Sequence, residues 1–375
     1  MPPAHFEGRV ATLFVCGDVM TGRGIDQVLP HPSEPCLHEP YVDSAREYVA
    51  MAENVNGRIA KPADFAYIWG DALGEWDRFA PDLRIVNLET SITESGDYEP
   101  KGINYRMHPE NTPCLTAAGI GCCALANNHV LDWGLKGLSS SLSALRGAGI
   151  TTAGAGGNLD EALRPAVNES RGSRVLVFAV ATEDSGVPSH WAATNNRPGI
   201  ALLRDLSRDT ASSLAGRMRA NRQPGDLVVL SIHWGGNWGY EIPAEQRAFA
   251  HILLDSGSAD VIYGHSSHHP KAIEVYSGRP ILYGCGDFLN DYEGIPGYEH
   301  FRSNLVLMYF ISLERQTGEL AALRMVPLRI RRFRLEHVGA PEAEWLRDML
   351  NREGKRTGTE AVLGESNTLD LRWQG

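Results

Sequence analysis

The residues best suited to chemistry in this sequence form a short histidine-rich loop. Three imidazoles, those of His265, His268 and His269, stand within five residues in the stretch 264–270 (GHSSHHP). The loop follows an apolar run, residues 259–263, that we predict to be a buried strand, and loops after the strands of α/β sheets commonly carry functional groups. Neutral imidazole is also the commonest metal ligand. The stretch predicts a metal-binding loop, and the alternative is a solvated polar loop.

Polar side chains also follow four other apolar runs. Each alone has an ordinary structural explanation, such as a helix N-cap for Asp18. Together they mix imidazole nitrogen with carboxylate and amide oxygen, which suits Zn, Mn, Fe or a related cation rather than a soft thiolate site. One bridging carboxylate could hold two ions about 3.5–4 Å apart. The five predicted strand ends deliver Asp18, Glu89, Asn128 with His129, His233, and His265 with His268.

The elements that must position these side chains alternate between strands and helices, which makes the strand ends plausible neighbours at one sheet edge. No internal repeat or low-complexity linker is visible. We therefore expect one domain over residues 1–335, with an insertion at about 30–63, followed by a C-terminal helix and polar tail over 336–375. The expected strands are 10–16, 82–86, 121–125, 175–181, 226–232, 259–263, 304–313 and 320–334, and the expected helices are 64–79, 135–148, 205–221, 244–255 and 342–352.

Composition narrows the possible partners and compartment. The 375 residues are 43% hydrophobic and carry a net charge of -11, which argues against nucleic acid. The one dense basic run, residues 329–334, alternates like a strand with a solvated face. No leader-like N-terminus and no apolar run of roughly 18 residues is visible, so we expect a cytoplasmic protein without membrane contact. Six cysteines without a CxxC pair indicate reduced thiols.

The order of the motifs resembles that of a known family. GDVM (17–20), NLET (87–90), ANNHVLDWG (126–134), HWG (233–235) and GHSSH (264–268) match the CapA family of capsule and poly-γ-glutamate synthesis proteins over about residues 10–290. That family resembles the calcineurin-like metallophosphoesterases. The resemblance implies an α/β (α+β) fold, a two-sheet β-sandwich flanked by helices. It also implies one or two divalent ions (Zn, Mn, Fe or Ca) and no organic cofactor.

The resemblance further implies particular roles for the strand-end residues. Asp18 and His268 look like ligands of one ion, and Glu89 looks like the bridge to the second. His129 looks like the acid/base histidine beside the ions. The remaining residues, Asn128, His233 and His265, look like ligands of the second ion.

Departures from the family pattern suggest different chemistry. The first motif lacks the histidine of the phosphoesterases because Met20 takes its place, His269 is an additional imidazole, and Asp287 stands where CapA proteins commonly have asparagine. A metal could stabilise an enolate while bases act on two faces of a carbon. We expect His129, His269, Asp287 and Cys285 to supply those catalytic bases.

These departures favour a metal-dependent isomerase that acts on a peptide. We expect epimerisation at a Cα centre near a C-terminal carboxylate, in the manner of the soluble CapA-like lasso-peptide epimerases. The alternatives are a CapA-type protein of capsule or poly-γ-glutamate synthesis, and a phosphoesterase-like hydrolase. Arg106 could hold a carboxylate or phosphate in a bidentate contact, or be structural. The oligomeric state is left open, and the residues expected to bind the peptide substrate are Arg23, Lys101, Arg106, Trp234 and Asn237.

Overall fold

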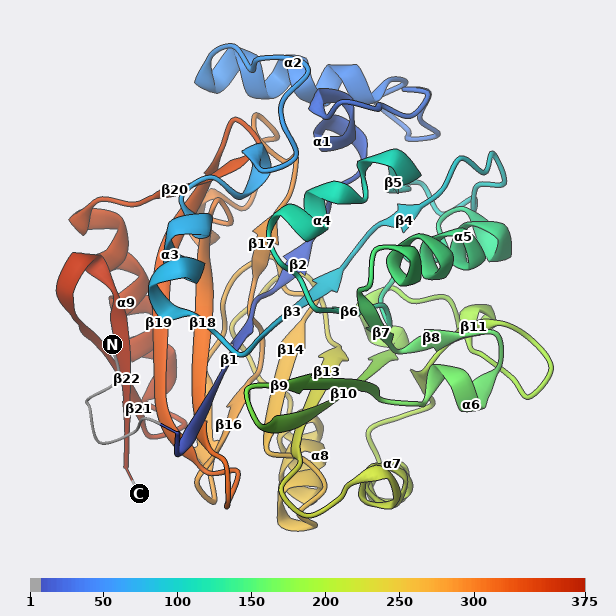
Figure 1. The fold of residues 1–375 in the computed structure, drawn as a ribbon. Helices are drawn as coiled ribbons and strands as arrows, with labels where there is room; N and C mark the ends of the chain where they lie inside the picture. Colours follow the sequence, from blue (N-terminus) through green and yellow to red (C-terminus); the bar gives the residue numbers. More distant parts are fainter. Residues whose placement is uncertain (1–7, 375) are drawn as a thin grey trace.

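The computed structural model describes residues 8–374 and shows two large β-sheets packed against each other, with helices around them (Figure 1). One sheet has 11 strands and the other has seven. A buried hydrophobic cluster with residues from both sheets fills the space between them. The fold is therefore the mixed α/β sandwich with flanking helices that the family resemblance implied.

The 11-stranded sheet contains both the first and the last strands of the chain. Its hydrogen-bonded path begins near the N-terminal motifs and ends in the C-terminal hairpin. The path is β17 (Asp287–Leu289), β2 (Asp18–Val19), β3 (Leu83–Leu88), β1 (Val10–Val15), β18 (Leu305–Glu314), β19 (Leu320–Arg331), β22 (Leu369–Trp373) and β21 (Thr359–Leu363). Off this path, β20 (Arg334–His337) pairs with β19, and β6 (Cys122–Ala124) joins β3 to β7 (Thr151–Ala153).

The seven-stranded sheet comes from the middle of the chain. Its path is β12 (Leu202–Leu203), β10 (Ser173–Thr182), β13 (Leu227–His233), β14 (Val261–His265), β16 (Arg279–Leu282) and β15 (Ile273–Tyr276), with β9 (Ala166–Ser170) beside β10. Two short pairs stand apart, β8 (Ala155–Gly156) with β11 (Gly199–Ile200), and β4 (Ser91–Ile92) with β5 (Arg106–Met107).

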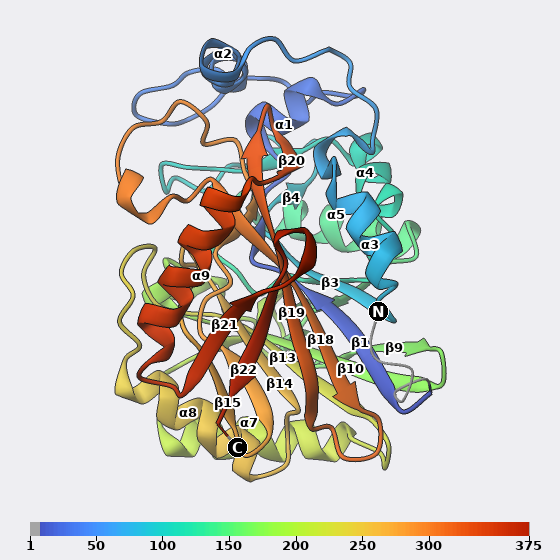
Figure 2. The same ribbon diagram turned by 90° about the vertical axis from the view of Figure 1, so that its left-hand side faces the viewer.

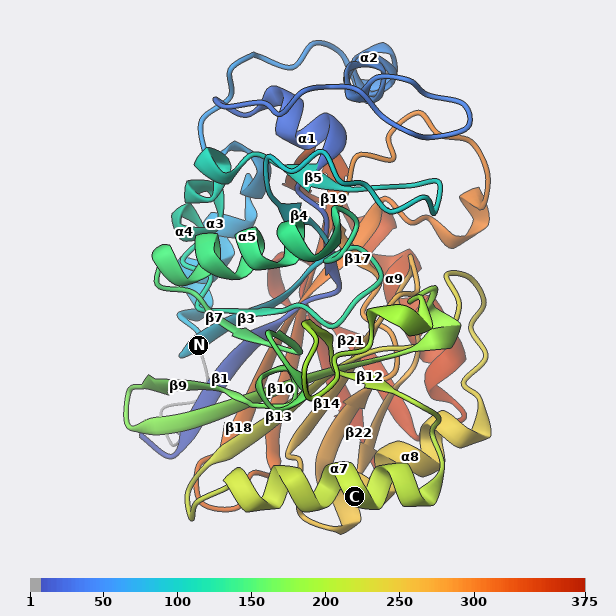
Figure 3. The same cartoon turned by 90° about the vertical axis from the view of Figure 1, so that its right-hand side faces the viewer.

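Helices cover the outer faces of the sandwich. The helices over residues 208–221 and 244–255 lie along the outside of the seven-stranded sheet (Figure 3), and the last helix packs against β21 (Figure 2). In chain order they are α1 (Arg23–Val28), α2 (Ala45–Asn56), α3 (Ala72–Phe79), α4 (Pro113–Ala117), α5 (Gly134–Gly147), α6 (Leu159–Ala162), α7 (Arg208–Asn221), α8 (Ala244–Asp255) and α9 (Ala340–Gly354).

Strand β10 shows why the sequence makes a sandwich here. Successive side chains of a strand point to opposite faces of the sheet. Val175 and Val177 belong to the cluster between the sheets, whereas Leu176 and Phe178 belong to the cluster under α7 and α8. The continuous apolar run of β10 therefore serves two cores, as is usual for strands covered on both faces.

Parallel pairing gathers the strand ends that carry the sequence motifs. Strands β10, β13 and β14 are parallel neighbours, and His233 and His265 are register partners at the ends of β13 and β14. On the other sheet, Asp18 of β2 is paired with Asn87 of β3 and with Asp287 of β17. Because the carboxyl ends of parallel strands lie at the same sheet edge, the polar residues of both sheets meet there.

Three expected elements differ from the structure. The strand expected over 320–334 is interrupted by a hairpin turn, because Arg332 and Phe333 have positive φ angles, so β19 ends at Arg331 and β20 pairs back against it. Residues 64–79 form a 3₁₀ helix, Tyr67–Trp69, and then α3, because Gly70 between them has a φ of +44° that breaks the helix. The polar tail expected after α9 forms the β21–β22 hairpin instead, and β22 pairs with β19. Pairing with a strand distant in sequence stabilises these short segments, and local sequence does not reveal it.

Within residues 8–374, no helix is long and apolar enough to cross a membrane. The first seven residues, which contain most of the N-terminal stretch interpreted as lacking a leader, lie outside the described range.

Candidate metal centre

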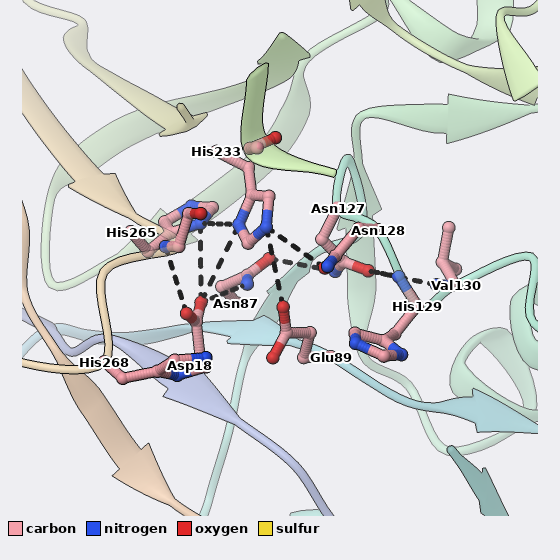
Figure 4. A network of polar contacts seen from close by, with 12 residues as sticks. Asp18, Asn87, Glu89, Asn127, Asn128, His129, Val130, His233, His265 and His268 are labelled. Carbon is pink, nitrogen blue, oxygen red and sulfur yellow. Dashed lines mark hydrogen bonds and ion pairs between the residues drawn. The ribbon is translucent and has the colours of Figure 1, made fainter. Parts of the chain in front are cut away.

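Two histidine rings face each other at the ends of the parallel strands β13 and β14. The Nδ1 atoms of His233 and His265 are 2.7 Å apart, and Asp18 Oδ1 lies 3.9 Å and 3.5 Å from them, respectively (Figure 4). All three side chains are buried. Their donor atoms lie within 4.8 Å of one another, an arrangement that could hold a metal ion.

Backbone geometry and hydrogen bonds fix the position of Asp18. The side chain of Asn87 donates to Oδ1 at 2.7 Å, and the backbone N–H of Ser266 donates to Oδ2 at 3.0 Å. The preceding residue must be glycine, because a β-carbon on Gly17 would overlap the carbonyl oxygen of Gly286. Asn87 belongs to the NLET motif but was not singled out from the sequence.

A second group of donors lies on the opposite edge of the His233 ring. His233 Nε2 is 3.1 Å from Asn128 Oδ1 and 3.5 Å from Glu89 Oε1 (Figure 4). Asn127, which sequence reasoning passed over, shapes this loop, since its Oδ1 accepts the backbone N–H groups of His129 and Val130. Its place inside the ANNH motif was the only available signal. The His233 ring therefore lies between Asp18 on one side and Asn128 with Glu89 on the other.

His268 lies apart from the facing imidazoles and is paired with Asp287. Its Nδ1 is 2.9 Å from Asp287 Oδ1, and Asp287 Oδ2 accepts a 2.8 Å hydrogen bond from Asn290. Burial alone would lower the pKa of His268, but the charges of Asp287 and Asp18 raise it overall. This ion pair favours a charged His268 beside the cluster, whereas the resemblance implied a ligand.

The protonation behaviour of the buried groups is compatible with a divalent cation. Burial, followed by the charge of Asp287, raises the pKa of Asp18 to about 7. Burial and the charges of Asp18 and Asp287 raise the pKa of Glu89 well above its ordinary value. Burial lowers the pKa of His265 to about 3 and that of His233 well below its usual range, so both imidazoles are neutral and keep a lone pair. Three crowded carboxylates and two neutral imidazoles fit a divalent cation.

His129 is held rigidly beside this cluster. Its Nδ1 lies 2.6 Å from Asp132 Oδ2, and its ring stacks on Tyr105 at 3.8 Å between centroids. Lys101 Nζ is 2.9 Å from the other carboxylate oxygen of Asp132. Burial and the nearby Lys101 charge lower the pKa of His129 well below its ordinary value. Asp132 thus orients a neutral ring, although no separate signal in the sequence pointed to it.

A pocket of about 470 Å³ opens above the cluster. Aromatic side chains form much of its wall, among them Tyr105, Tyr292, Trp238 and Tyr298. The buried Arg23 lines it but is already paired with Asp291 and Glu39. The predicted site residues that line this pocket are Arg23, Glu89, Lys101, Asn128, His129, His233, Asn237 and His268.

Other predicted residues do not line the pocket. Both ring nitrogens of His269 are engaged by backbone, since Nδ1 donates to the Pro270 carbonyl and Nε2 accepts from the Gly239 N–H, each at 3.1 Å. Cys285 is fully buried, and burial raises the pKa of its thiol well above the ordinary range. His269 and Cys285 are therefore poorly placed to act as the expected bases.

Two of the expected substrate-binding side chains are also used elsewhere. Arg106 donates to the backbone carbonyls of Ser95 and Glu34 and lies over the Trp133 ring at 4.0 Å. Trp234 is buried and donates its indole N–H to the Tyr283 carbonyl at 3.0 Å. Both contacts hold loops in place, which was the structural alternative for Arg106.

Comparisons with known proteins point to one family. The profile described as "Bacterial capsule synthesis protein PGA_cap" matches residues 12–292. A "Probable polyglutamine synthesis accessory protein" of Mycobacterium tuberculosis is 48% identical over 365 residues, which is 96% of either chain. The "Capsule biosynthesis protein CapA" of Bacillus anthracis is 26% identical over 88% of this chain and 70% of that protein. The "PGA biosynthesis protein CapA" of Bacillus subtilis is 27% identical over 62% and 58%, respectively.

These relatives correct the activity that was expected from the motif departures. Their names describe accessory and capsule biosynthesis proteins, and none of the three names an isomerase or a hydrolase. The expectation of a metal-dependent peptide epimerase is therefore wrong. It relied on His269 and Cys285 as bases and on Met20 as a sign of changed chemistry, and those local departures did not outweigh the shared motif order.

Proposed function

Because the chain belongs to the bacterial capsule synthesis protein family PGA_cap, we propose that it is an accessory protein in the synthesis of a glutamate polymer and that it acts through a bound divalent cation. The names of the relatives support an accessory role in polymer synthesis: the Mycobacterium protein is named for polyglutamine and the Bacillus subtilis protein for PGA. The buried cluster under the pocket supports the cation. The observation that carries the proposal is the meeting of Asp18, His233 and His265, of which His233 also lines that pocket.

The residues of the cluster would share the work of holding the cation. Asp18, His233 and His265 offer the three converging donors, and Glu89 and Asn128 add oxygen atoms at the other edge of His233. A bound divalent ion supplies positive charge that attracts a carboxylate or amide oxygen. Lys101 is less suited to that task, because its ammonium group is committed to Asp132 and to the Asn128 carbonyl.

The pocket walls would orient a chain end that enters from outside. The hydroxyl groups of Tyr105 and Tyr292 are 2.6 Å apart, so the two rings hold each other in place. Trp238 stacks on Tyr298 at 4.2 Å, and Tyr298 is more than half exposed at the rim. Rigid aromatic walls favour an extended chain whose polar end reaches the cation while water is kept out.

The first experiment measures metal in the purified protein. Elemental analysis of wild type, Asp18→Asn and His265→Ala should give at least one equivalent for wild type and a strong loss in both variants. The matched control is His300→Ala, which removes an exposed histidine outside the cluster. A wild-type protein without a stoichiometric metal, after purification in buffer free of chelators, contradicts the cation.

The second experiment measures polymer. A host strain that lacks the gene receives wild type, Asp18→Asn or His300→Ala, and its glutamate polymer is quantified by acid hydrolysis. We expect wild type and His300→Ala to restore the polymer and Asp18→Asn to fail. Normal polymer in the strain without the gene contradicts the accessory role, and full restoration by Asp18→Asn contradicts the role of the cation.

A further inference from the structure

Four arginines gather around one carboxylate on the β19–β20 hairpin, outside the pocket. Arg332 lies 3.2 Å from Glu336 and donates a hydrogen bond to it. The other three guanidinium groups stand 3.8–3.9 Å from the same carboxylate. Their side chains remain 31–41% exposed, so solutes can reach them. We call Arg329, Arg331, Arg332 and Arg334 the arginine cluster.

The cluster has far more donors than the fold uses. Each guanidinium carries five N–H groups. Among residues 8–374, its side chains donate only two hydrogen bonds, from Arg331 to Asn56 at 3.3 Å and from Arg332 to Glu336. The Nε atoms of Arg329, Arg332 and Arg334 are buried without a partner. The partly exposed guanidinium groups therefore keep other N–H groups that form no hydrogen bond within the described chain and can bind an anion.

The register of the hairpin also brings two of the positive charges close together. Arg331 and Arg334 are directly opposite each other on neighbouring strands, and like charges in that position destabilise a sheet. The nearby carboxylates are already engaged. Glu293 accepts the backbone N–H groups of Arg332 and Phe333, and Asp71 accepts that of His337. Glu342 lies 3.5 Å from Arg329, and Asp71 lies 3.9 Å from Arg334, so residues 8–374 supply two further partial ion pairs but no hydrogen bond to these guanidinium groups.

We propose that the arginine cluster is a second binding site of the protein, which takes side-chain carboxylates of the glutamate polymer. This inference rests on the proposed function. A guanidinium group matches a carboxylate in a two-bond fork, and several such contacts along one chain add up. A nucleic acid is a poorer fit, because it needs a longer basic tract than this acidic chain offers.

The site lies close to the pocket along the chain and in space. Glu293 accepts a backbone N–H group of the hairpin turn. Two residues earlier in the chain, Asp291 pairs with the pocket residue Arg23. Tyr292, between the two acids, lines the pocket itself. Figure 2 shows β20 beside α1 and below α2, the elements that supply Arg23 and Tyr48 to the pocket. A polymer whose end occupies the pocket can therefore contact the arginine cluster further along.

The test measures binding of a fluorescein-labelled oligomer of glutamate by anisotropy at low salt. We expect Arg331→Gln/Arg334→Gln to bind about tenfold more weakly than wild type, as the loss of two partly exposed charge contacts implies. The matched control, Arg208→Gln/Arg219→Gln, removes two exposed charges from α7 and should bind like wild type. Equal binding by the cluster variant and wild type overturns the proposal.

Three further measurements distinguish a carboxylate-binding site from a purely structural cluster and from a general anion site. The cluster variant should melt no lower than wild type, because it loses a like-charge pair, whereas a purely structural role predicts a lower melting temperature. Equally tight binding of an uncharged glutamine oligomer, or tighter binding of DNA or of anionic vesicles, overturns the proposal. A normal metal result with unaltered binding by the cluster variant thus rejects this inference alone.

Discussion

Replacing Asp18 by asparagine in the metal-free protein should change its stability by an amount that depends on pH. Burial, with Asp287 next, raises the pKa of Asp18 from its ordinary 3.8 to about 7. One pKa unit corresponds to about 1.4 kcal/mol, so the ionised carboxylate destabilises the metal-free fold by about 4 kcal/mol above pH 7. The folded state binds the extra proton, and the free energy of unfolding therefore falls as pH rises from about 4 to about 7.

Asparagine removes the charge but loses part of the hydrogen bonding. Asn87 and Ser266 both donate to the carboxylate, and an asparagine has one oxygen to accept from them. A buried donor left unpaired costs about 1–3 kcal/mol. Asp18→Asn should therefore be about 1–3 kcal/mol more stable than wild type above pH 7, and less stable by a similar amount near pH 4, where Asp18 of the wild type is protonated and uncharged.

Urea unfolding after removal of metal with a chelator measures this difference across the pH range. We expect the difference in unfolding free energy between variant and wild type to shift in favour of the variant by about 1.4 kcal/mol per pH unit between about pH 4 and about pH 7. Above pH 7 the difference should level off. Asp43→Asn, a change at an exposed position, should show no such trend. A difference between Asp18→Asn and wild type that does not vary with pH would refute the reasoning.

Three more outcomes follow from packing and charge. Gly17→Ala should lower the free energy of unfolding, measured by urea titration, by about 3 kcal/mol or more, because the new β-carbon overlaps a backbone carbonyl oxygen. The control, Gly216→Ala in α7, places its β-carbon in open space and should raise the free energy of unfolding by about 0.4–1 kcal/mol. Lys101→Met should destabilise by about 3–5 kcal/mol in the same assay, since it removes the ammonium group from the buried Asp132 and leaves it the neutral His129 ring and the Tyr105 N–H as partners. A colourimetric thiol reagent should modify the exposed Cys36 rapidly and the buried cysteines slowly, so Cys36→Ser should abolish the fast phase.

Sequence reasoning located the strand ends because its signal is local. Apolar runs of strand length followed by a polar motif placed His233 and His265 at strand ends, and α/β alternation placed those ends at one edge. Helix α8 was predicted with its observed bounds because residues 244–255 have clear periodicity and Pro243 precedes them. In contrast, the β21–β22 hairpin was missed, since its stability comes from pairing with β19.

The histidine-rich loop separates what the sequence by itself determined from what tertiary structure decided. The sequence determined which residue types stand at the strand end, and parallel pairing of β13 and β14 then requires His233 and His265 to be neighbours. The directions of His268 and His269 were decided only in the folded chain. Asp287 from β17 pairs with one ring, whereas Phe301 stacks on the other at 4.3 Å and backbone groups engage both its nitrogens. Apart from the adjacent Pro270 carbonyl, those partners come from distant segments, so only the packed fold could assign the two imidazoles to different surroundings.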